Sequence, residues 1–214
     1  MLRNKCINKT MLMSGVLGFA LAAPAMAVQQ GDWIVRAGAA NVMPDDSSGQ
    51  VGAIAGSGVD VDDALGIFAN VTYMIRNNIG LELLVATPFE HEITGTGSIA
   101  GLGKIAEVKH LPPTFSVQYH FAPTSNFRPY VGAGINYTTF FSEKAVGGTV
   151  TSISLDDSWG LAVQAGFDVD MAQNLFFNAD VRYINIETTA TTNVGNVDVD
   201  INPWVVSLGV GMRF

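Results

Sequence analysis

The chain has 214 residues, of which 48% are hydrophobic and only 14% are charged, compared with roughly 25% charged residues in an ordinary soluble domain. Its net charge is −8, which argues against nucleic acid as a partner because few cations are available to neutralise phosphates. A single cysteine excludes a disulfide scaffold and a thiolate metal cluster.

Residues 1–27 have the three parts of a secretory signal peptide. Basic residues precede an apolar run at 11–23, and the small residues Ala25 and Ala27 end it. We expect cleavage after Ala27, which leaves residues 28–214 as a single domain outside the cytoplasm. A signal anchor is the alternative, but the run is short for a spanning helix of about 20 residues, and a proline breaks it.

From residue 32 onward, apolar and polar residues alternate, as in strands with two different faces. In the last strand every even position from Trp204 to Phe214 is apolar, while the odd positions are mostly small or polar. Comparable segments, close to the roughly 9–11 residues that cross a bilayer at a tilt, predict eight strands. They are residues 32–42, 66–75, 79–89, 111–121, 128–141, 159–169, 175–183 and 204–214.

The predicted connections alternate between short and long. The short ones are residues 76–78, 122–127 and 170–173, and the long ones are 43–65, 90–110, 142–158 and 187–202. This pattern is typical of outer-membrane barrels, with short turns in the periplasm and long loops outside. We therefore expect an all-β fold, an eight-stranded antiparallel up-and-down transmembrane β-barrel in the bacterial outer membrane, with both termini periplasmic.

A soluble barrel of the lipocalin type is the structural alternative, and it would carry an outer face rich in Lys and Glu. Here the polar face is rich in glycine instead, and aromatic residues gather near strand ends, as in interfacial girdles. They are Trp33, Tyr73, Phe89, Tyr119, Phe121, Trp159, Tyr183 and Trp204. The terminal Phe214 is typical of the signal recognised by the barrel assembly machinery. Expected partners are that machinery, outer-membrane lipid and lipopolysaccharide.

Six strings, in order along the chain, resemble the OmpW family of small outer-membrane proteins. They are GDWIVRAGAANVMPDD, NIGLELLVATPFEHEI, VKHLPPTFSVQYHF, FRPYVGAGINYTTFF, SLDDSWG and DINPWVVSLGVGMRF. The resemblance covers essentially the whole chain after residue 27. It implies an eight-stranded barrel whose hydrophobic channel admits small apolar solutes and releases them sideways into the membrane.

Prolines point to the place where such an exit would lie. Pro88 is expected to face inward near the end of one strand, and Pro112 and Pro113 lie at the same height at the start of the next. Proline cannot donate to a strand ladder, and unpaired backbone groups are costly in hydrocarbon. The three prolines therefore predict a lateral opening. The alternative is that they only end the strands before a long loop.

Strand parity divides the predicted lumen into two halves. A polar plug fills the lower and middle part, formed by Arg36, Glu82, Gln118, Asp168, Asp180, Arg182 and Arg213. Its three cations and three anions can pair. An apolar funnel lies above it, formed by Val42, Phe68, Leu84, Phe140, Ile184, Ile186 and Val205. These apolar side chains either admit a solute or only pack against one another and the loops.

The sequence offers little for catalysis. His91, His110 and His120 lack the spaced partners of a metal site, so we expect no enzyme, cofactor or metal. Acidic clusters in the long loops could hold divalent cations against lipopolysaccharide, although solvated loop acids explain them more simply. The expected function is uptake of small hydrophobic molecules with lateral release. The alternative is a structural, adhesion or receptor barrel that acts through its loops.

Overall fold

The computed structural model describes residues 27–214 except 46, 147 and 149. The predicted signal peptide, apart from Ala27, lies outside the described residues, so its cleavage remains a prediction.

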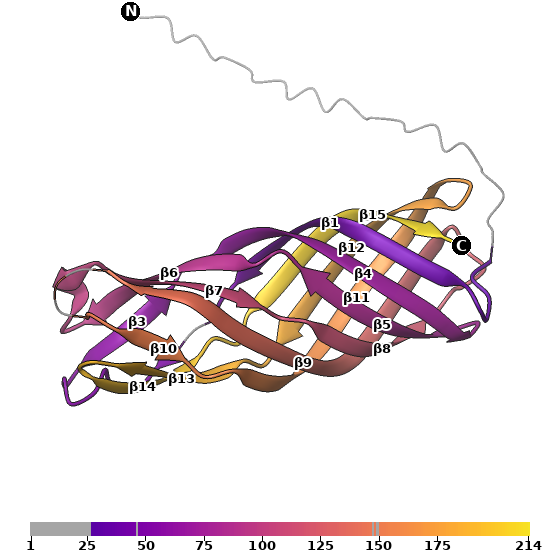
Figure 1. The fold of residues 1–214 in the computed structure, drawn as a ribbon. Coiled ribbons are helices and arrows are strands. Elements are labelled where there is room, and N and C mark those ends of the chain that lie inside the picture. The colour runs from indigo at the N-terminus through magenta and orange to yellow at the C-terminus, as the bar shows by residue number, and fades with distance from the viewer. Residues whose placement is uncertain (1–26, 46, 147, 149) are drawn as a thin grey trace, which may run out of the picture.

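Eight antiparallel strands form a closed barrel (Figure 1). They are β1 (Trp33–Met43), β4 (Ala64–Arg76), β5 (Ile79–Ala86), β8 (Thr114–His120), β9 (Phe127–Ala145), β11 (Ser158–Ala172), β12 (Leu175–Ile184) and β15 (Trp204–Arg213). Each pairs with its neighbours in chain order, and β1 pairs with β15 to complete the ring. The predicted eight-stranded up-and-down topology is confirmed.

The faces of the strands follow the predicted alternation. In β15, Trp204, Val206 and Leu208 are 41–54% exposed, whereas Val205 and Ser207 are at most 9% exposed. The outer wall is therefore apolar, which is the reverse of a soluble barrel. Within the described residues, the sole helical element is the short 3₁₀ turn Ala100–Leu102, and no helix there is long and apolar enough to span a membrane.

The long connections are folded too, which corrects their prediction as loops. They contain β2 (Ser47–Ser48), β3 (Ser57–Val61), β6 (Phe89–Gly97), β7 (Lys104–Leu111), β10 (Ile153–Leu155), β13 (Glu187–Thr192) and β14 (Gly195–Asp200). β3, β6 and β7 extend the barrel sheet along β9, while β10, β13, β14 and β2 form a second sheet. Short apolar alternations such as that of Val197 and Val199 lie among Gly, Asn and Asp residues, which disfavour strands.

We call these seven strands the extension. It continues the barrel at the loop end, and β9 runs through both parts (Figure 1). The short turns and both ends of the described chain lie at the opposite end, the turn end. Trp159 and Trp204, which are 71% and 47% exposed, face outward just below the extension, where an interfacial girdle is expected.

Candidate functional site

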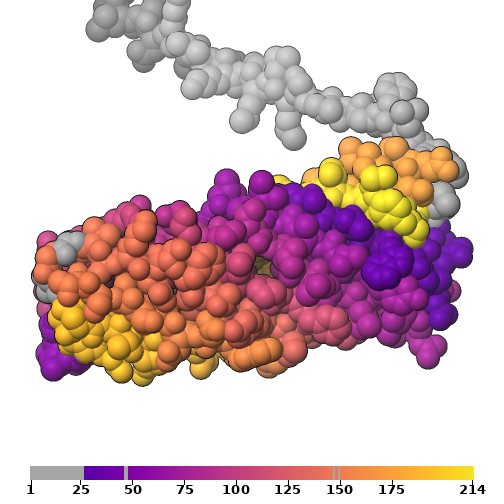
Figure 2. All heavy atoms as spheres, in the orientation of Figure 1, coloured from indigo at the N-terminus to yellow at the C-terminus, as the bar shows by residue number. Residues whose placement is uncertain are grey.

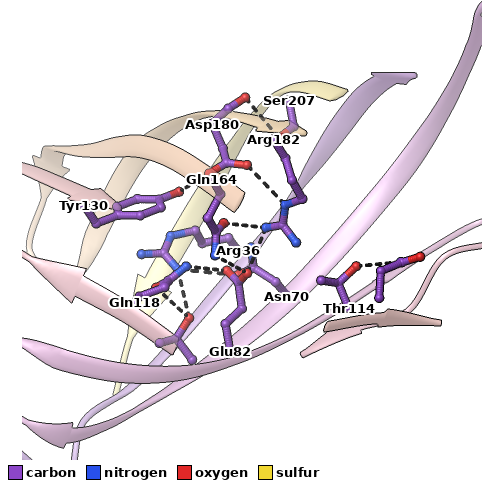
Figure 3. A network of polar contacts seen from close by, with 12 residues as sticks. Arg36, Asn70, Glu82, Thr114, Gln118, Tyr130, Gln164, Asp180, Arg182 and Ser207 are labelled. Atoms are coloured by element: carbon purple, nitrogen blue, oxygen red, sulfur yellow. Dashed lines mark hydrogen bonds and ion pairs between the residues drawn. The ribbon is translucent and has the colours of Figure 1, made fainter. Parts of the chain in front are cut away.

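The lower lumen is filled by a hydrogen-bonded polar plug (Figure 3), to which every barrel strand contributes at least one buried polar side chain. At its centre the Glu82 carboxylate accepts hydrogen bonds from Gln118 at 2.7 Å, Gln164 at 3.1 Å and Arg182 at 2.8 Å. The Arg182 Nε also lies 3.7 Å from an Asp180 oxygen. Because these groups are buried and paired with one another, the plug leaves no charge isolated at the barrel centre.

A second ion pair crosses the lumen nearer the turn end. Arg36 donates to both oxygens of Asp168, at 3.0 and 2.8 Å, which is the strong bidentate geometry. The Arg36 guanidinium also lies 5.1 Å from the centre of the Tyr130 ring. The Tyr130 hydroxyl donates to Asp180 at 3.1 Å, so it links the two ion-pair groups into one network.

One predicted member of the plug pairs differently. Arg213 is buried, but it takes part in none of the lumen ion pairs found among the described residues, so the expected pairing of three cations with three anions is wrong. The third lumen ion pair is Arg128 with Asp170, at 2.6 Å. Arg128 and Asp170 lie near the short turns, where strand parity does not predict the direction of a side chain, so the sequence pattern did not single them out.

Above the plug lies a small, mainly apolar cavity. It is lined by Val42, Phe68, Leu84, Ile184 and Val205 from the predicted apolar set, together with Ala86, Phe89 and Pro112. The space open to the centre of a water molecule is about 30 Å³, at least twice the roughly 10–15 Å³ that one enclosed water requires. We call this space the lower cavity.

A second cavity lies inside the extension, and we call it the upper chamber. Its open space is about 50 Å³, and its walls are almost wholly apolar. Phe140 and Ile186, the other two predicted lumen residues, line this space and not the lower cavity. The apolar lumen is therefore divided into two cavities instead of forming one continuous funnel.

An aromatic layer separates the two cavities. The His110 ring lies 4.9 Å from His91, 5.6 Å from Phe89 and 5.9 Å from Phe140. Phe89 lines the lower cavity, whereas the other three line the upper chamber. Burial lowers the pKa of His110 to about 3 and also lowers that of His91, so both rings are neutral near pH 7.

The barrel wall is interrupted beside the lower cavity. Pairing between β5 and β8 ends at Leu84 and Thr114, and pairing between β6 and β7 starts at Phe89 and His110. No strand pairing joins residues 85–88 to 111–113, all of which the structure describes. Figure 2 shows a small opening at this height, with yellow atoms of the C-terminal part visible through it.

Each edge of this gap is stabilised by hydrogen bonds to the neighbouring strand on the side away from the gap. Thr87 donates its amide hydrogen to Ile67 of β4 at 2.8 Å. On the other edge, the buried Asn136 side chain donates to the carbonyl oxygens of Pro112 and Pro113, at 3.1 and 3.2 Å. Carbonyl groups that the missing ladder leaves free are thus satisfied inside the wall. Asn136 was not singled out from the sequence, because its role depends on a contact across strands.

The three predicted prolines flank this gap, but not all as expected. Pro112 is buried and lines the lower cavity, and Pro113 is half-buried beside it. Pro88 is exposed, so its predicted inward orientation is wrong. The break at Thr87 and Pro88 reverses the strand parity, which turns Phe89 into the lumen, where it is 2% exposed. Phe89 is consequently not a girdle residue.

The remaining sequence candidates lie apart from this site. Phe214 is 68% exposed beside Trp33, with which it exchanges backbone hydrogen bonds at the turn end. His120 is in the plug, 3.2 Å from the Gln118 side chain, far along the barrel from the histidine pair. Within the described part of the chain, no three His, Cys, Asp or Glu residues are grouped so that they could hold a metal ion.

Comparison with known proteins agrees with this architecture. The model of the OmpW family matches residues 29–214. The chain belongs to the OmpW family. Outer membrane protein W of Vibrio cholerae is 48% identical, over 97% of this chain and 100% of the relative. This OmpW-family protein is therefore an outer-membrane β-barrel.

Solved structures of the family support the same fold. The crystal structure of the outer membrane protein OprG from Pseudomonas aeruginosa has a TM-score of 0.83 at 38% identity, and the match covers 88% of this chain and 98% of OprG. The solid-state NMR structure of AlkL in DMPC lipid bilayers has a TM-score of 0.65 at 29% identity, with 90% and 94% coverage. All three relatives are outer-membrane proteins by name.

Proposed function

We propose that this barrel takes up small hydrophobic molecules and releases them sideways into the outer membrane. The observation that carries the proposal is the gap between residues 85–88 and 111–113, which lies beside the lower cavity and directly above the plug. An apolar solute that reached this cavity would meet buried ion pairs below it and the membrane interior beside it. Lateral release is then the path of lower free energy.

The proposed path begins in the extension. A solute enters the upper chamber, passes the aromatic layer and reaches the lower cavity behind Pro112. Both cavities are small, so side chains have to move aside as the solute passes, as is common for channels lined by apolar residues.

The proposal also includes the orientation of the protein. The extension faces the outside of the cell, surrounded at its base by lipopolysaccharide, and the turn end with both termini faces the periplasm, as in other outer-membrane barrels. Outer-membrane lipid covers the apolar wall, and Phe214 serves as the assembly signal. We assign no enzymatic activity, cofactor or metal to the barrel.

A reversible cross-link across the gap tests lateral release. Ala86 and Pro112 both line the lower cavity, and they oppose each other if the register of β5 and β8 is continued past Leu84 and Thr114. In an Ala86→Cys/Pro112→Cys variant, oxidation should close the gap and reduce uptake of an apolar solute to that of protein-free liposomes. Reduction should restore uptake because it breaks the cross-link. The same protein sample thus serves as its own control.

Two further variants sharpen the result. Cysteines at Leu83 and Phe115, which are already paired and exposed on the outer wall, form a matched cross-link that should leave uptake unchanged. Replacing Pro88, Pro112 and Pro113 by Ala supplies amide hydrogens that allow the ladder to extend, and uptake should fall while boiling-dependent gel mobility is retained. Unchanged uptake in the oxidised gap variant, with cross-linking verified by mass spectrometry, would refute lateral release.

A further inference from the structure

The aromatic layer contains two of the three polar side chains that line the upper chamber. The rings of His91 and His110 are stacked there, with an interplanar angle of 18°. Apart from these rings and Thr192, the walls consist of aliphatic and aromatic residues. A solute on the proposed path therefore meets imidazole nitrogens at the boundary between the two cavities.

The hydrogen bonding of His91 defines which nitrogen carries a proton. Its Nδ1 lies 2.6 Å from the backbone oxygen of Asp62. A carbonyl oxygen only accepts hydrogen bonds, so Nδ1 carries the hydrogen and donates it. Burial lowers the pKa of His91 and keeps the ring neutral, and in a neutral ring the other nitrogen, Nε2, is then an acceptor.

The Nε2 atom of His91 is buried and has no hydrogen-bond partner among the described residues. Asp62 lies on the outer side, in the connection that follows β3. His91 lines the upper chamber, and because the Asp62 carbonyl occupies Nδ1, Nε2 is the ring nitrogen that remains available to a molecule in the chamber. Burying an acceptor without a donor costs free energy, which a suitable ligand would recover.

The neighbours of His91 restrict the chemistry of that ligand. The charges of Asp62 and Asp63 act on His91, and they would repel an anionic ligand. A cation would lose its hydration among walls that are nearly all apolar. A neutral molecule with one hydroxyl or N–H group avoids both costs, and a flat ring would also stack within the aromatic layer.

We propose that His91 Nε2 is a specificity contact that accepts a hydrogen bond from apolar solutes carrying one neutral donor, such as phenols or alcohols. This inference rests on the proposed uptake function, because it places the contact on the same path. It predicts that such solutes bind more tightly than hydrocarbons of the same shape, once the difference in their partitioning between water and an apolar phase is taken into account.

The test compares 1-naphthol with naphthalene, which differ by one hydroxyl group. Binding of each to the detergent-solubilised full barrel is measured by equilibrium dialysis for the wild type and for His91→Phe, which keeps a stacking ring and removes the acceptor. For each protein, the affinity for 1-naphthol is divided by the affinity for naphthalene. Comparing this preference between the wild type and His91→Phe cancels the difference in solvation of the two probes. We expect the preference for 1-naphthol to fall by about 2- to 10-fold in His91→Phe, the size of one neutral hydrogen bond.

Two controls accompany this comparison. Lys109→Gln changes a charge on the outer face of β7, away from the chamber, and should keep the wild-type preference. In the wild type, ¹⁵N NMR should show a shift of the His91 Nε2 signal with 1-naphthol and not with naphthalene. This second readout holds even if His91→Phe does not fold.

The outcomes separate the two proposals. If both probes bind, but with the same preference in the wild type and in His91→Phe and no Nε2 shift, the histidine contact is refuted and the uptake proposal stands. If neither probe binds the folded wild-type barrel, the uptake proposal fails and the histidine inference fails with it.

Discussion

The barrel and the extension have opposite distributions of polarity, although β9 runs through both. The barrel has an apolar outer wall, with Leu161 69% exposed, around a lumen filled by ion pairs. The extension has an apolar interior, and its outer face carries ion pairs such as Lys109 with Glu90. Each part buries the groups that its surroundings would not solvate, which are polar groups in lipid and apolar groups in water.

The comparison shows where a solute path can lie. Polar side chains in the barrel hold one another through specific hydrogen bonds, so they form a rigid floor. Apolar side chains in the extension are held by non-directional contacts and can rearrange at smaller cost. The gap lies where one arrangement gives way to the other, at the height of Pro112 and Asn136.

The largest effect is expected from breaking the plug. Asp168→Leu leaves the fully buried Arg36 without its bidentate partner, and removing one member of a buried ion pair typically costs about 3–5 kcal/mol. The midpoint of urea unfolding in detergent, followed by tryptophan fluorescence, should fall accordingly. An Arg36→Met/Asp168→Leu double variant should recover most of the loss, because no unpaired charge remains. Equal losses in the single and double variants would contradict this account of the plug.

An intermediate effect is expected in the extension at low pH. The pKa of His110 is about 3 in the folded protein because burial disfavours its charge, against about 6.5 when unfolded. As pH falls below 6.5, the unfolded extension binds a proton that the folded one does not. Stability is then lost by about 1.4 kcal/mol per pH unit until the folded pKa is reached. His91 acts in the same direction, partly opposed by Asp62 and Asp63.

Hydrogen exchange of peptides from β6 and β7 measures this loss. After correction for intrinsic rates, exchange should be faster at pH 5 than at pH 7 in the extension, while the barrel strands stay protected. A His110→Phe variant should reduce the pH dependence of β6 and β7. Equal protection at both pH values in the wild type would show that His110 does not limit the stability of the extension.

The smallest effect is expected on the outer face of the extension. Lys104 lies 2.8 Å from Glu92 and 2.7 Å from Glu107, but all three side chains are accessible to water. Exposed ion pairs contribute little because water and salt screen them. Lys104→Met should therefore leave hydrogen exchange in β6 and β7 unchanged within error, at low and high salt alike. A clear loss of protection would show that this face, and not only the apolar interior, holds the extension together.

The sequence by itself determined the barrel. A period of two residues assigns each side chain to the lumen or the lipid within a single strand, so the eight strands and the inward residues Arg36, Glu82 and Asp168 could be predicted locally. Alternating connection lengths then defined the up-and-down topology. The strands in the long connections could not be predicted, because their apolar alternations are short and are interrupted by Gly, Asn and Asp.

Only the tertiary structure decided which groups meet. Arg36 and Asp168 are 132 residues apart, and Arg182 and Glu82 are 100 apart, so their pairing depends on the tilt and stagger of a closed barrel. The stacking of His91 on His110 and the contact of Asn136 with Pro112 arise in the same way. Each is a contact between strands, whose register no local pattern of residues specifies.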